Sequence, residues 1–323
     1  MAPWAKAAFD LIGGTDNNPR NIMSTYNPTS PGSQSVEAPV TGEYLENGRY
    51  YPSYKRGQYM FPCDEEERDR LDVFHRMYFE ARKGHLHSAP LARDRQVRIL
   101  DAGTGTGIWA IQMADTYQNA LLTGTDLTMM QPNLIPANAR FLQSDMEAPW
   151  SLGETGWDMI HVRAMMGSIA RWDQFYHEVT RHLLPGEGRL EHVEIDWTPR
   201  CDDGTLAENA AVRTWAHELM GVMDETGRPM RFDPPRQRQL MAEAGLVDIT
   251  EEIIKVPFNG WEGDLADRPA GRFFFLGLKK GIEALSLAPF CRYKRMSPEE
   301  VKAVTDKVIS EVSLRRNHGY CNL

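Results

Sequence analysis

The sequence predicts an α/β fold in which a mostly parallel sheet carries helices on both of its faces. Short apolar runs alternate with amphipathic helical patterns from residue 99 to residue 195. The first apolar run leads directly into a glycine-rich turn, and the second ends in an acidic residue. Strands and helices that alternate in this way indicate right-handed crossovers and a parallel sheet.

The glycine-rich turn lies in Ile99–Trp109, which reads ILDAGTGTGIW. A short strand ends at Asp101, and a helical pattern begins at Ile108. The glycines between them occupy alternate positions, at Gly103, Gly105 and Gly107. Glycine allows a sharp turn and lets a ligand press against bare backbone. Because the first strand-to-helix turn of an open α/β sheet is where nucleotides bind, the segment predicts a cofactor site.

The class of cofactor follows from what the turn lacks. A dinucleotide fingerprint needs a third glycine five residues after the first, and Ile108 stands at that position. The Gly-Lys-Ser/Thr of a Walker loop does not follow either. The next strand, Leu121–Asp126, ends in a carboxylate that can accept hydrogen bonds from both ribose hydroxyls. A glycine loop without a phosphate site, together with this carboxylate, favours S-adenosylmethionine over a plain tight turn.

The later elements continue the alternation. The pattern predicts a third strand that ends at Asp145, which could hydrogen-bond an adenine amino group, and a fourth with His161 at its carboxyl end. An amphipathic helix follows and ends before Pro185, and a fifth strand completes the series. The ranges of these four elements are Arg140–Met146, Trp157–Arg163, Trp172–Leu184 and Gly188–Ile195.

Two residues are candidates for a catalytic role, His161 and Glu194. Methyl transfer needs mainly orientation and desolvation, so the fold itself names no catalytic residue. His161 could act as a general base, because a histidine pKa lies near neutrality, or it could lend only its backbone carbonyl to the cofactor's ammonium group. We favour the backbone role.

Glu194 belongs to an acidic run that also includes Glu191, Asp196, Asp202 and Asp203. Strand alternation would place Glu194 and Asp196 on one face, at the mouth of an acceptor site. Two carboxylates there would favour a cationic acceptor, such as a lysine or arginine side chain. The equally weighted alternative is that Glu194 pairs with an arginine, Arg163 or Arg200, and fixes the loop.

The segments outside this core are less regular. Residues 1–42 are predicted to be flexible, because residues 13–42 hold few large apolar groups. Asp64 and Glu67 form a capping-box pattern before a helix. Tyr59, just ahead of this helix, could cover the methionine end of the cofactor or could equally have an ordinary packing role. The apolar face of this helix comprises Leu71, Phe74, His75 and Tyr78, and we expect His75 to be a core residue.

Beyond the fifth strand the patterns predict three helices and two strands. The stripe of large apolar residues in the third helix indicates core packing, with a lid or partner surface as the alternative. The short last strand suggests a small edge strand or a truncated chain. The predicted helices cover residues 208–226, 234–244 and 270–288, and the predicted strands cover residues 247–257 and 319–323.

Several segments resemble fungal LaeA-type proteins. The most specific is the acidic-aromatic run Val193–Asp203. The others are Glu46–Arg49, Arg56–Tyr59, Pro62–His75, Gly107–Ala110 and Leu285–Phe290. The resemblance covers roughly residues 43–323. One departure is Thr104, where many members of the family have cysteine, and so small a residue should not disturb the loop.

The resemblance implies a class I methyltransferase (Rossmann-like) fold with an N-terminal helical cap and C-terminal inserted helices. It implies one domain over residues 43–323, with a cofactor-binding core at about 95–200 and acceptor or lid elements at 201–323. It also implies an intracellular regulator of secondary metabolism and development, nuclear and also cytoplasmic, that joins velvet-domain proteins. The methyl acceptor is undefined, with a protein side chain as one candidate. The implied cofactor-binding residues are Tyr59, Asp101, Gly103, Thr104, Gly105, Gly107, Asp126, Leu127, Asp145, Met146 and His161.

Composition narrows the function classes. The net charge is −9, from 45 acidic and 36 basic residues, and no concentrated basic run stands out, so direct nucleic-acid binding is not expected. The sequence contains no run of 18 apolar residues, so no membrane-spanning helix is predicted. The four cysteines are scattered without metal-binding spacing, which fits an intracellular protein. Two functions stay open, a working methyltransferase and a methyltransferase-shaped scaffold with little turnover. Ile108 sets a dehydrogenase aside.

Overall fold

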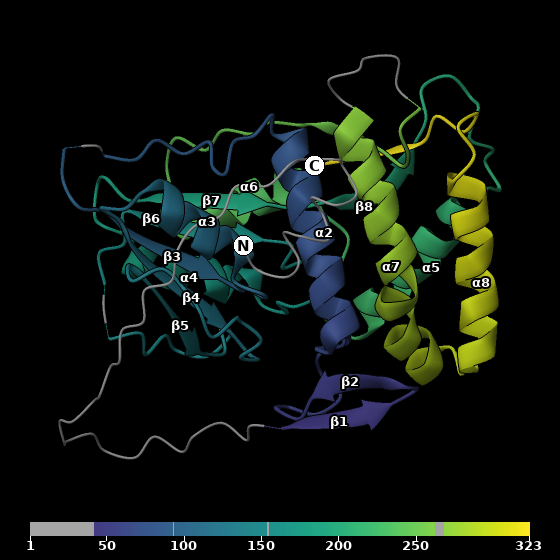
Figure 1. The fold of residues 1–323 in the computed structure, drawn as a ribbon, viewed down its shortest axis with the longest axis horizontal. Coiled ribbons are helices and arrows are strands. Elements are labelled where there is room, and N and C mark those ends of the chain that lie inside the picture. The colour runs from purple at the N-terminus through teal and green to yellow at the C-terminus, as the bar shows by residue number, and fades with distance from the viewer. Residues whose placement is uncertain (1–41, 93, 154, 262–267) are drawn as a thin grey trace, which may run out of the picture. The chain divides into compact units, whose positions relative to one another are not determined.

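The structure is a computed structural model that describes residues 42–323 except 93, 154 and 262–267. All of these residues belong to one compact unit, residues 39–323. The segment predicted to be flexible, residues 1–42, lies almost entirely outside the described residues. Figure 1 gives the element labels used below.

A five-stranded, entirely parallel sheet forms the core, with strand order β5-β4-β3-β6-β7. Neighbouring residues of a strand point to opposite faces of the sheet, and helices cover both of these faces. Ile99 packs with α3 on one face, and Leu100 packs with α4 and α6 on the other. This confirms the predicted fold class. The strands are β3 Arg98–Ala102, β4 Leu121–Asp126, β5 Ala139–Gln143, β6 Met159–Arg163 and β7 Arg189–Val193, and the helices are α3 Ile108–Thr116, α4 Trp172–His182 and α6 Pro234–Glu243.

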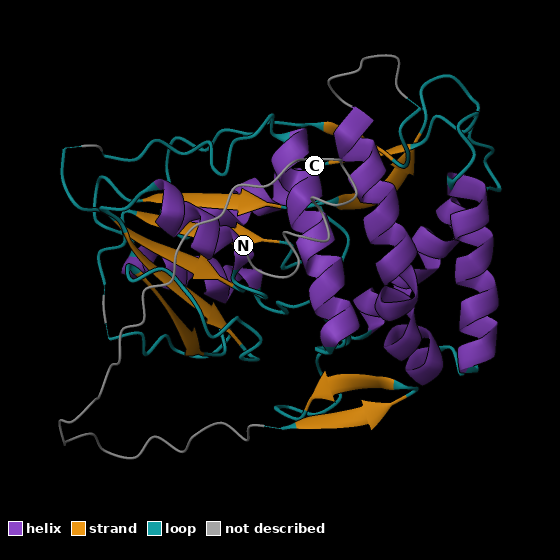
Figure 2. Cartoon of the chain, viewed as in Figure 1, coloured by secondary structure: helices purple, strands orange, loops and turns teal. Residues whose placement is uncertain are grey.

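A group of helices stands beside this sheet and forms a second layer (Figures 1 and 2). Its members are α2 Glu65–Ala81, α5 Ala211–Glu225, α7 Arg268–Tyr293 and α8 Pro298–Val312. α2 runs along α7, and two glycines one turn apart in α7 allow the close approach. A Cβ on Gly277 would lie 2.8 Å from the Phe74 ring, and one on Gly281 would collide with the stem of Arg70.

A small antiparallel sheet joins the two layers, with order β8-β10-β9. Its strands are β8 Asp196–Arg200, β9 Lys255–Pro257 and β10 Tyr320–Asn322. β10 is the middle strand, so the prediction of a short edge strand at residues 319–323 is wrong. The long strand predicted at residues 247–257 is reduced to its last three residues, and Val247 and Ile253 are exposed rather than buried in a sheet.

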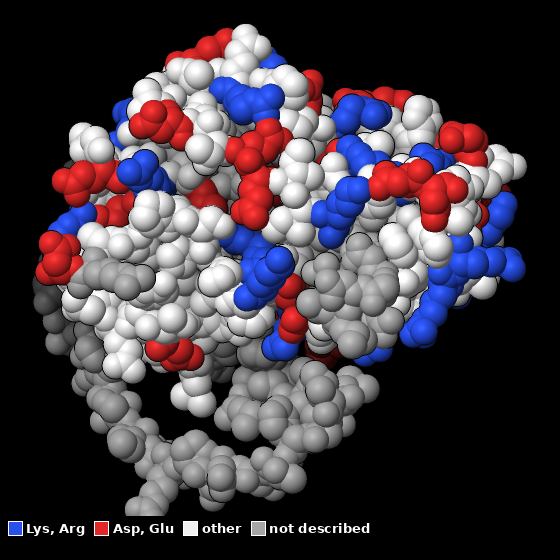
Figure 3. Space-filling view, turned by 90° about the horizontal axis from the view of Figure 1, so that it is seen from above, with Lys and Arg blue, Asp and Glu red and all other residues white. Residues whose placement is uncertain are grey.

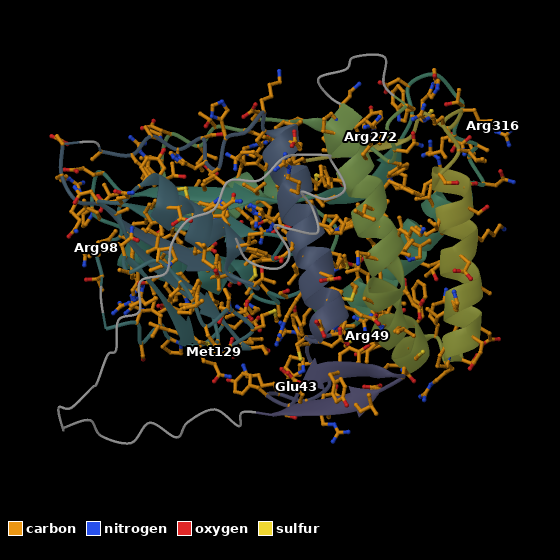
Figure 4. All side chains as sticks on the ribbon, in the orientation of Figure 1. Glu43, Arg49, Arg98, Met129, Arg272 and Arg316 are labelled. Atoms are coloured by element: carbon orange, nitrogen blue, oxygen red, sulfur yellow. The ribbon has the colours of Figure 1, made fainter. Side chains whose placement is uncertain are left out.

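The chain enters α2 through a hairpin of β1 Glu43–Glu46 and β2 Arg49–Pro52. Glu43 and Arg49 are labelled on these strands in Figure 4. The turn of the β1–β2 hairpin consists of Asn47 and Gly48, which both have positive φ, as a two-residue hairpin turn requires. Arg292 of α7 holds the hairpin by a 2.6 Å contact with Glu46. The sequence analysis did not recognise this turn.

Two predicted boundaries move in ways that affect the site. β5 ends at Gln143, so Asp145 lies in the loop after the strand. β7 ends at Val193, and Asp196 already belongs to the small sheet. Glu194 and Asp196 therefore do not share one strand, and the alternation argument that placed both at an acceptor site is wrong.

Candidate functional site

Two adjoining cavities lie where β3, β4 and β6 end, between the parallel sheet and α2. The first has a volume of about 120 Å³ and the second about 60 Å³. Figure 4 shows the side chains that fill the space between sheet and helices. The residues that line both cavities are Tyr59, Gly103, Asp126, Met130, Met165 and Ser168.

The carboxylate of Asp101 links the glycine turn to β6 by hydrogen bonds. One carboxylate oxygen accepts a 2.5 Å hydrogen bond from the Thr104 hydroxyl, and the other accepts a 2.9 Å hydrogen bond from Nδ1 of His161. Gly103 has φ of +74° and donates its N–H to the Thr125 carbonyl at 2.9 Å. The turn is therefore fixed by Asp101 and by the neighbouring strand, with its backbone facing the first cavity.

Asp126 ends β4 and faces both cavities. Its Oδ2 accepts the Gly105 N–H at 2.8 Å, and its Oδ1 accepts the Thr128 N–H at 3.1 Å. Burial raises the pKa of Asp126, and these backbone donors oppose the shift. Each carboxylate oxygen has a second lone pair, so Asp126 can still accept hydrogen bonds from a ligand.

The second cavity contains the other predicted cofactor residues, Leu127, Asp145 and Met146. Lys55 and Tyr54 contact one carboxylate oxygen of Asp145, at 2.6 Å and 3.1 Å. Burial raises the pKa of Asp145, but the hydrogen bonds from Lys55, the Glu147 N–H and Tyr54, together with the charge of Lys55, outweigh burial and the net shift is downward. Asp145 is therefore an ionised acceptor at the cavity wall.

Met165 separates the two cavities. Its sulfur lies directly over Gly103, so that a Cβ on Gly103 would collide with it. The preceding residue, Ala164, has φ of +56°, a conformation that is strained for a residue with a side chain. The positive φ of Ala164 thus directs the loop after β6 so that the sulfur of Met165 lies on the glycine turn.

Glu194 holds this loop in place. Its Oε1 accepts the N–H groups of Met165 and Met166 at 2.7 Å and 3.2 Å, and Nε2 of His192 lies 2.9 Å from the same oxygen. The structure therefore favours the loop-fixing alternative for Glu194, but backbone amides take the place of the arginines that the sequence suggested. Glu194 also lines the first cavity.

The other residues of the acidic run do not gather at the cavity. Each has a basic partner, and none of them is among the residues that line the two cavities. The prediction that paired carboxylates form the mouth of a site for a cationic acceptor is therefore wrong. The pairs are Glu191 with Arg82, Asp196 with Arg200, Asp202 with Lys255 and Asp203 with His318.

Two predicted site residues, His161 and Gly107, lie outside the cavity linings. His161 is in the middle of β6 and fully buried, and its ring stacks on Trp109 with centroids 3.7 Å apart. Burial lowers the pKa of His161, and its Nδ1 lies 2.9 Å from the Asp101 carboxylate. Gly107 starts α3 with φ of +76°, and a Cβ there would lie 2.6 Å from the ring of Phe141.

The sequence analysis missed most of the opposite wall of the first cavity. This wall is apolar and aromatic, and its residues come from elements far apart in the chain. The apolar periodicity of α2 was visible, but no local pattern places residues near 197, 230 and 285 beside it. The wall includes Phe61, Leu71, Phe74, Tyr78, Ile195, Trp197, Met230 and Leu285. It also holds a buried ion pair, Arg70 with Glu67 at 2.5 Å.

Comparison with known proteins agrees with this architecture. The model of a methyltransferase domain family matches residues 70–251, from α2 to beyond the parallel sheet. The secondary metabolism regulator LAE1 of Cochliobolus heterostrophus is 45% identical over 284 residues, which cover 87% of this chain and 92% of that protein. This chain belongs to the LaeA family of secondary metabolism regulators.

Other comparisons place the chain within the same family. The secondary metabolism regulator laeA of Aspergillus flavus is 37% identical over 97% of this LaeA-family chain and 86% of its own length.

Among solved structures, phosphoethanolamine N-methyltransferase 2 of Haemonchus contortus, in complex with S-adenosyl-L-methionine, is 13% identical. It covers 79% of this chain and 50% of its own, with a TM-score of 0.43, too low to carry an argument on function.

Proposed function

We propose that this LaeA-family chain is an S-adenosylmethionine-dependent methyltransferase. The observation that carries the proposal is the pairing of Gly105 with Asp126. It places a carboxylate with free lone pairs beside a bare glycine turn that has no phosphate-binding features.

The residues around this pair fit the parts of that cofactor. Asp126 would accept hydrogen bonds from the ribose hydroxyls. Leu127, Asp145 and Met146 line the second cavity, where Asp145 would accept the adenine amino group. Tyr59 faces both cavities, which suits a cover over the methionine end. The described residues contain no cluster of His, Cys, Asp or Glu arranged for a metal ion.

The chemistry of transfer leaves the protein a limited task. The bound cofactor supplies an activated methyl group and a good leaving group. The aromatic wall, with Phe74 and Trp197, would exclude water from the acceptor and orient it. Glu194 keeps Met165 and Met166 in position, and we assign no catalytic base.

Calorimetry of S-adenosylmethionine binding tests this function. We expect Asp126→Ala to weaken binding at least about tenfold, because two hydrogen bonds to the ribose are lost. Asp306→Ala is the matched control, since Asp306 is exposed in α8 and pairs only with Lys302 among the described residues. A folded wild-type protein that does not bind the cofactor would overturn the proposal.

We also propose, from the family resemblance, that the protein acts in the nucleus and binds velvet-domain proteins. The face drawn in Figure 3 mixes Lys and Arg with Asp and Glu, which fits a partner-mediated role better than a direct grip on DNA. No described helix is long and apolar enough to cross a membrane. Co-purification of a tagged chain with velvet-domain proteins from nuclei tests this role, and its absence from nuclei would contradict it.

A scaffold with little turnover is the second candidate. The observation in its favour is that Glu194, the one predicted catalytic residue at the cavity, already accepts two backbone hydrogen bonds. If a variant that binds cofactor but transfers no methyl group restores secondary metabolism in a deletion strain, the scaffold function is correct. Failure of that variant would support the enzyme.

A further inference from the structure

The first cavity contains two arginines in opposite electrostatic situations. Arg70 forms a two-pronged ion pair with Glu67, with contacts of 2.8 Å and 2.5 Å. Arg163, the last residue of β6, lines the same cavity. Within the described part of the chain, the side chain of Arg163 makes neither a hydrogen bond nor an ion pair, and its guanidinium lies 4.8 Å from the ring centroid of Tyr78.

The acidic groups whose charge acts on Arg163 already have other partners. Asp72 accepts the Thr106 hydroxyl at 2.7 Å. Asp101 accepts hydrogen bonds from Thr104 and His161, and Glu191 accepts the Ser88 and Ala89 N–H groups. Arg82, which pairs with Glu191, adds a repulsive positive charge close to Arg163. A guanidinium that is largely withdrawn from water and has no paired anion is costly, and Arg163 is only partly exposed, so the cavity is incomplete without a negative ligand.

Tyr78 supplies a second unsatisfied donor at the same place. Its hydroxyl is buried without a hydrogen-bond partner, although Tyr78 lines the cavity. Burial raises the pKa of Tyr78, so its hydroxyl keeps its proton at neutral pH. A guanidinium and a phenol hydroxyl together match the two oxygens of a carboxylate.

The strand register places these donors beside the glycine turn. Ala102 pairs with Val162, so the next residues along the two strands are Gly103 and Arg163. Asp101, Thr104 and Thr106 of the turn line the same cavity. The anion is therefore expected at the turn, where the proposed function places the amino-acid end of the cofactor.

We propose that Arg163 and Tyr78 form a carboxylate site that binds the methionine carboxylate of S-adenosylmethionine. This inference rests on the proposed function, because it assumes that the cofactor occupies the glycine turn. The carboxylate is the only anionic group of that cofactor, and its adenosine and sulfonium parts cannot satisfy a guanidinium. The alternative source of a carboxylate is the methyl acceptor, and the test separates the two.

The experiment compares S-adenosylmethionine with decarboxylated S-adenosylmethionine, which keeps the adenosine, the sulfonium and the amine. Calorimetry on the whole chain should show that the wild type binds the complete cofactor at least about tenfold more tightly. Arg163→Met should weaken binding of the complete cofactor about 10- to 100-fold and change binding of the decarboxylated form less than about twofold. Tyr78→Phe should give the same pattern at about fivefold.

Arg171→Met is the matched control, because Arg171 is exposed and pairs with Asp173. If Arg163→Met does not fold, the preference of the wild type for the complete cofactor still decides the proposal. Equal binding of the two ligands by the wild type overturns the carboxylate site but not the proposed function, and it points to the acceptor as the source of the anion. A folded wild type that binds neither ligand overturns both.

Discussion

The two sides of the first cavity are built in different ways. On the sheet side, the groups that face the cavity are backbone and short polar side chains at strand ends, such as Gly103, Thr104 and Asp126. On the helical side they are large apolar rings, such as Phe74 and Trp197, carried by α2 and β8. The sheet side is fixed by main-chain geometry, whereas the helical side is fixed by the packing of side chains.

This difference separates two kinds of perturbation. A change on the sheet side alters groups that would hold the cofactor and leaves the packing of the helices intact. A change on the helical side alters the fit between α2 and α7 and reaches the cofactor only through the cavity wall. Cofactor affinity and unfolding free energy should therefore respond to different residues.

The largest effect is expected from Gly103→Ala. The added methyl group would collide with Met165 and fill the floor shared by both cavities, so cofactor affinity should fall on the order of 100-fold, or about 2.7 kcal/mol. Gly153→Ala is the control, because Gly153 has φ of +73° but an added Cβ meets nothing within 4 Å. Calorimetry of cofactor binding measures both. Equal affinities in the two variants would show that Gly103 is only a turn residue.

The helical side is probed by Gly281→Ala. The new Cβ would displace the stem of Arg70 from the α2–α7 contact, so the free energy of unfolding should fall by about 1 to 3 kcal/mol. Gly221→Ala, in the middle of α5 with nothing near the added Cβ, should instead raise it by about 0.5 to 1 kcal/mol. Urea denaturation gives both values. A change of the same sign in both variants would contradict the packing role of Gly281.

A smaller effect is expected in the pH dependence of the free energy of unfolding, through His75 of α2. His75 is buried, and burial lowers its pKa to about 3, whereas in the unfolded chain its pKa is about 6.5. The folded state therefore excludes a proton that the unfolded state binds, so stability is fully present above about pH 6.5 and falls as the pH decreases toward 3. Between about pH 6.5 and pH 5.5 the loss due to His75 should be about 1 kcal/mol.

Denaturation of His75→Gln at these two pH values measures that contribution. The variant should lose about 1 kcal/mol less stability than the wild type over the interval. His177→Gln, at an exposed position of α4, should match the wild type. An unchanged pH dependence in His75→Gln would show that folding does not shift the pKa of His75.

The same two sides differ in how far the sequence predicted them. Strand ends carry their own signals, so Gly103 and Asp126 could be named from the glycine spacing and from an acidic residue after an apolar run. Trp197 and Leu285 meet only because β8 and α7 pack against α2, and no local pattern records that contact. β6 ends at Arg163 as predicted, but His161 lies two residues before that end with its ring stacked on Trp109, so its side chain does not line either cavity.

Some errors came from local signals that were present but not used. Asn47 and Gly48 form a standard hairpin turn, and Ser297 with Glu300 forms a complete capping box at the start of α8. At α2 the expected capping box is half formed. Asp64 accepts the Glu67 N–H, but the Glu67 side chain turns to Arg70 instead. An i,i+3 ion pair within α2 thus replaces the second hydrogen bond of the capping box.

The position of the Met165 side chain affects what fraction of the molecules can bind a ligand. Because its sulfur lies over Gly103 and its side chain lines both cavities, a ligand that contacts the bare backbone of Gly103 would bind only when another Met165 rotamer moves the sulfur aside. Only the fraction of molecules with that rotamer is ready to bind, and the apparent dissociation constant is the intrinsic one divided by that fraction. The rotamer equilibrium of a single methionine would then set the ligand concentration at which the site fills, while the polar groups of the site, such as Asp126, stay unchanged.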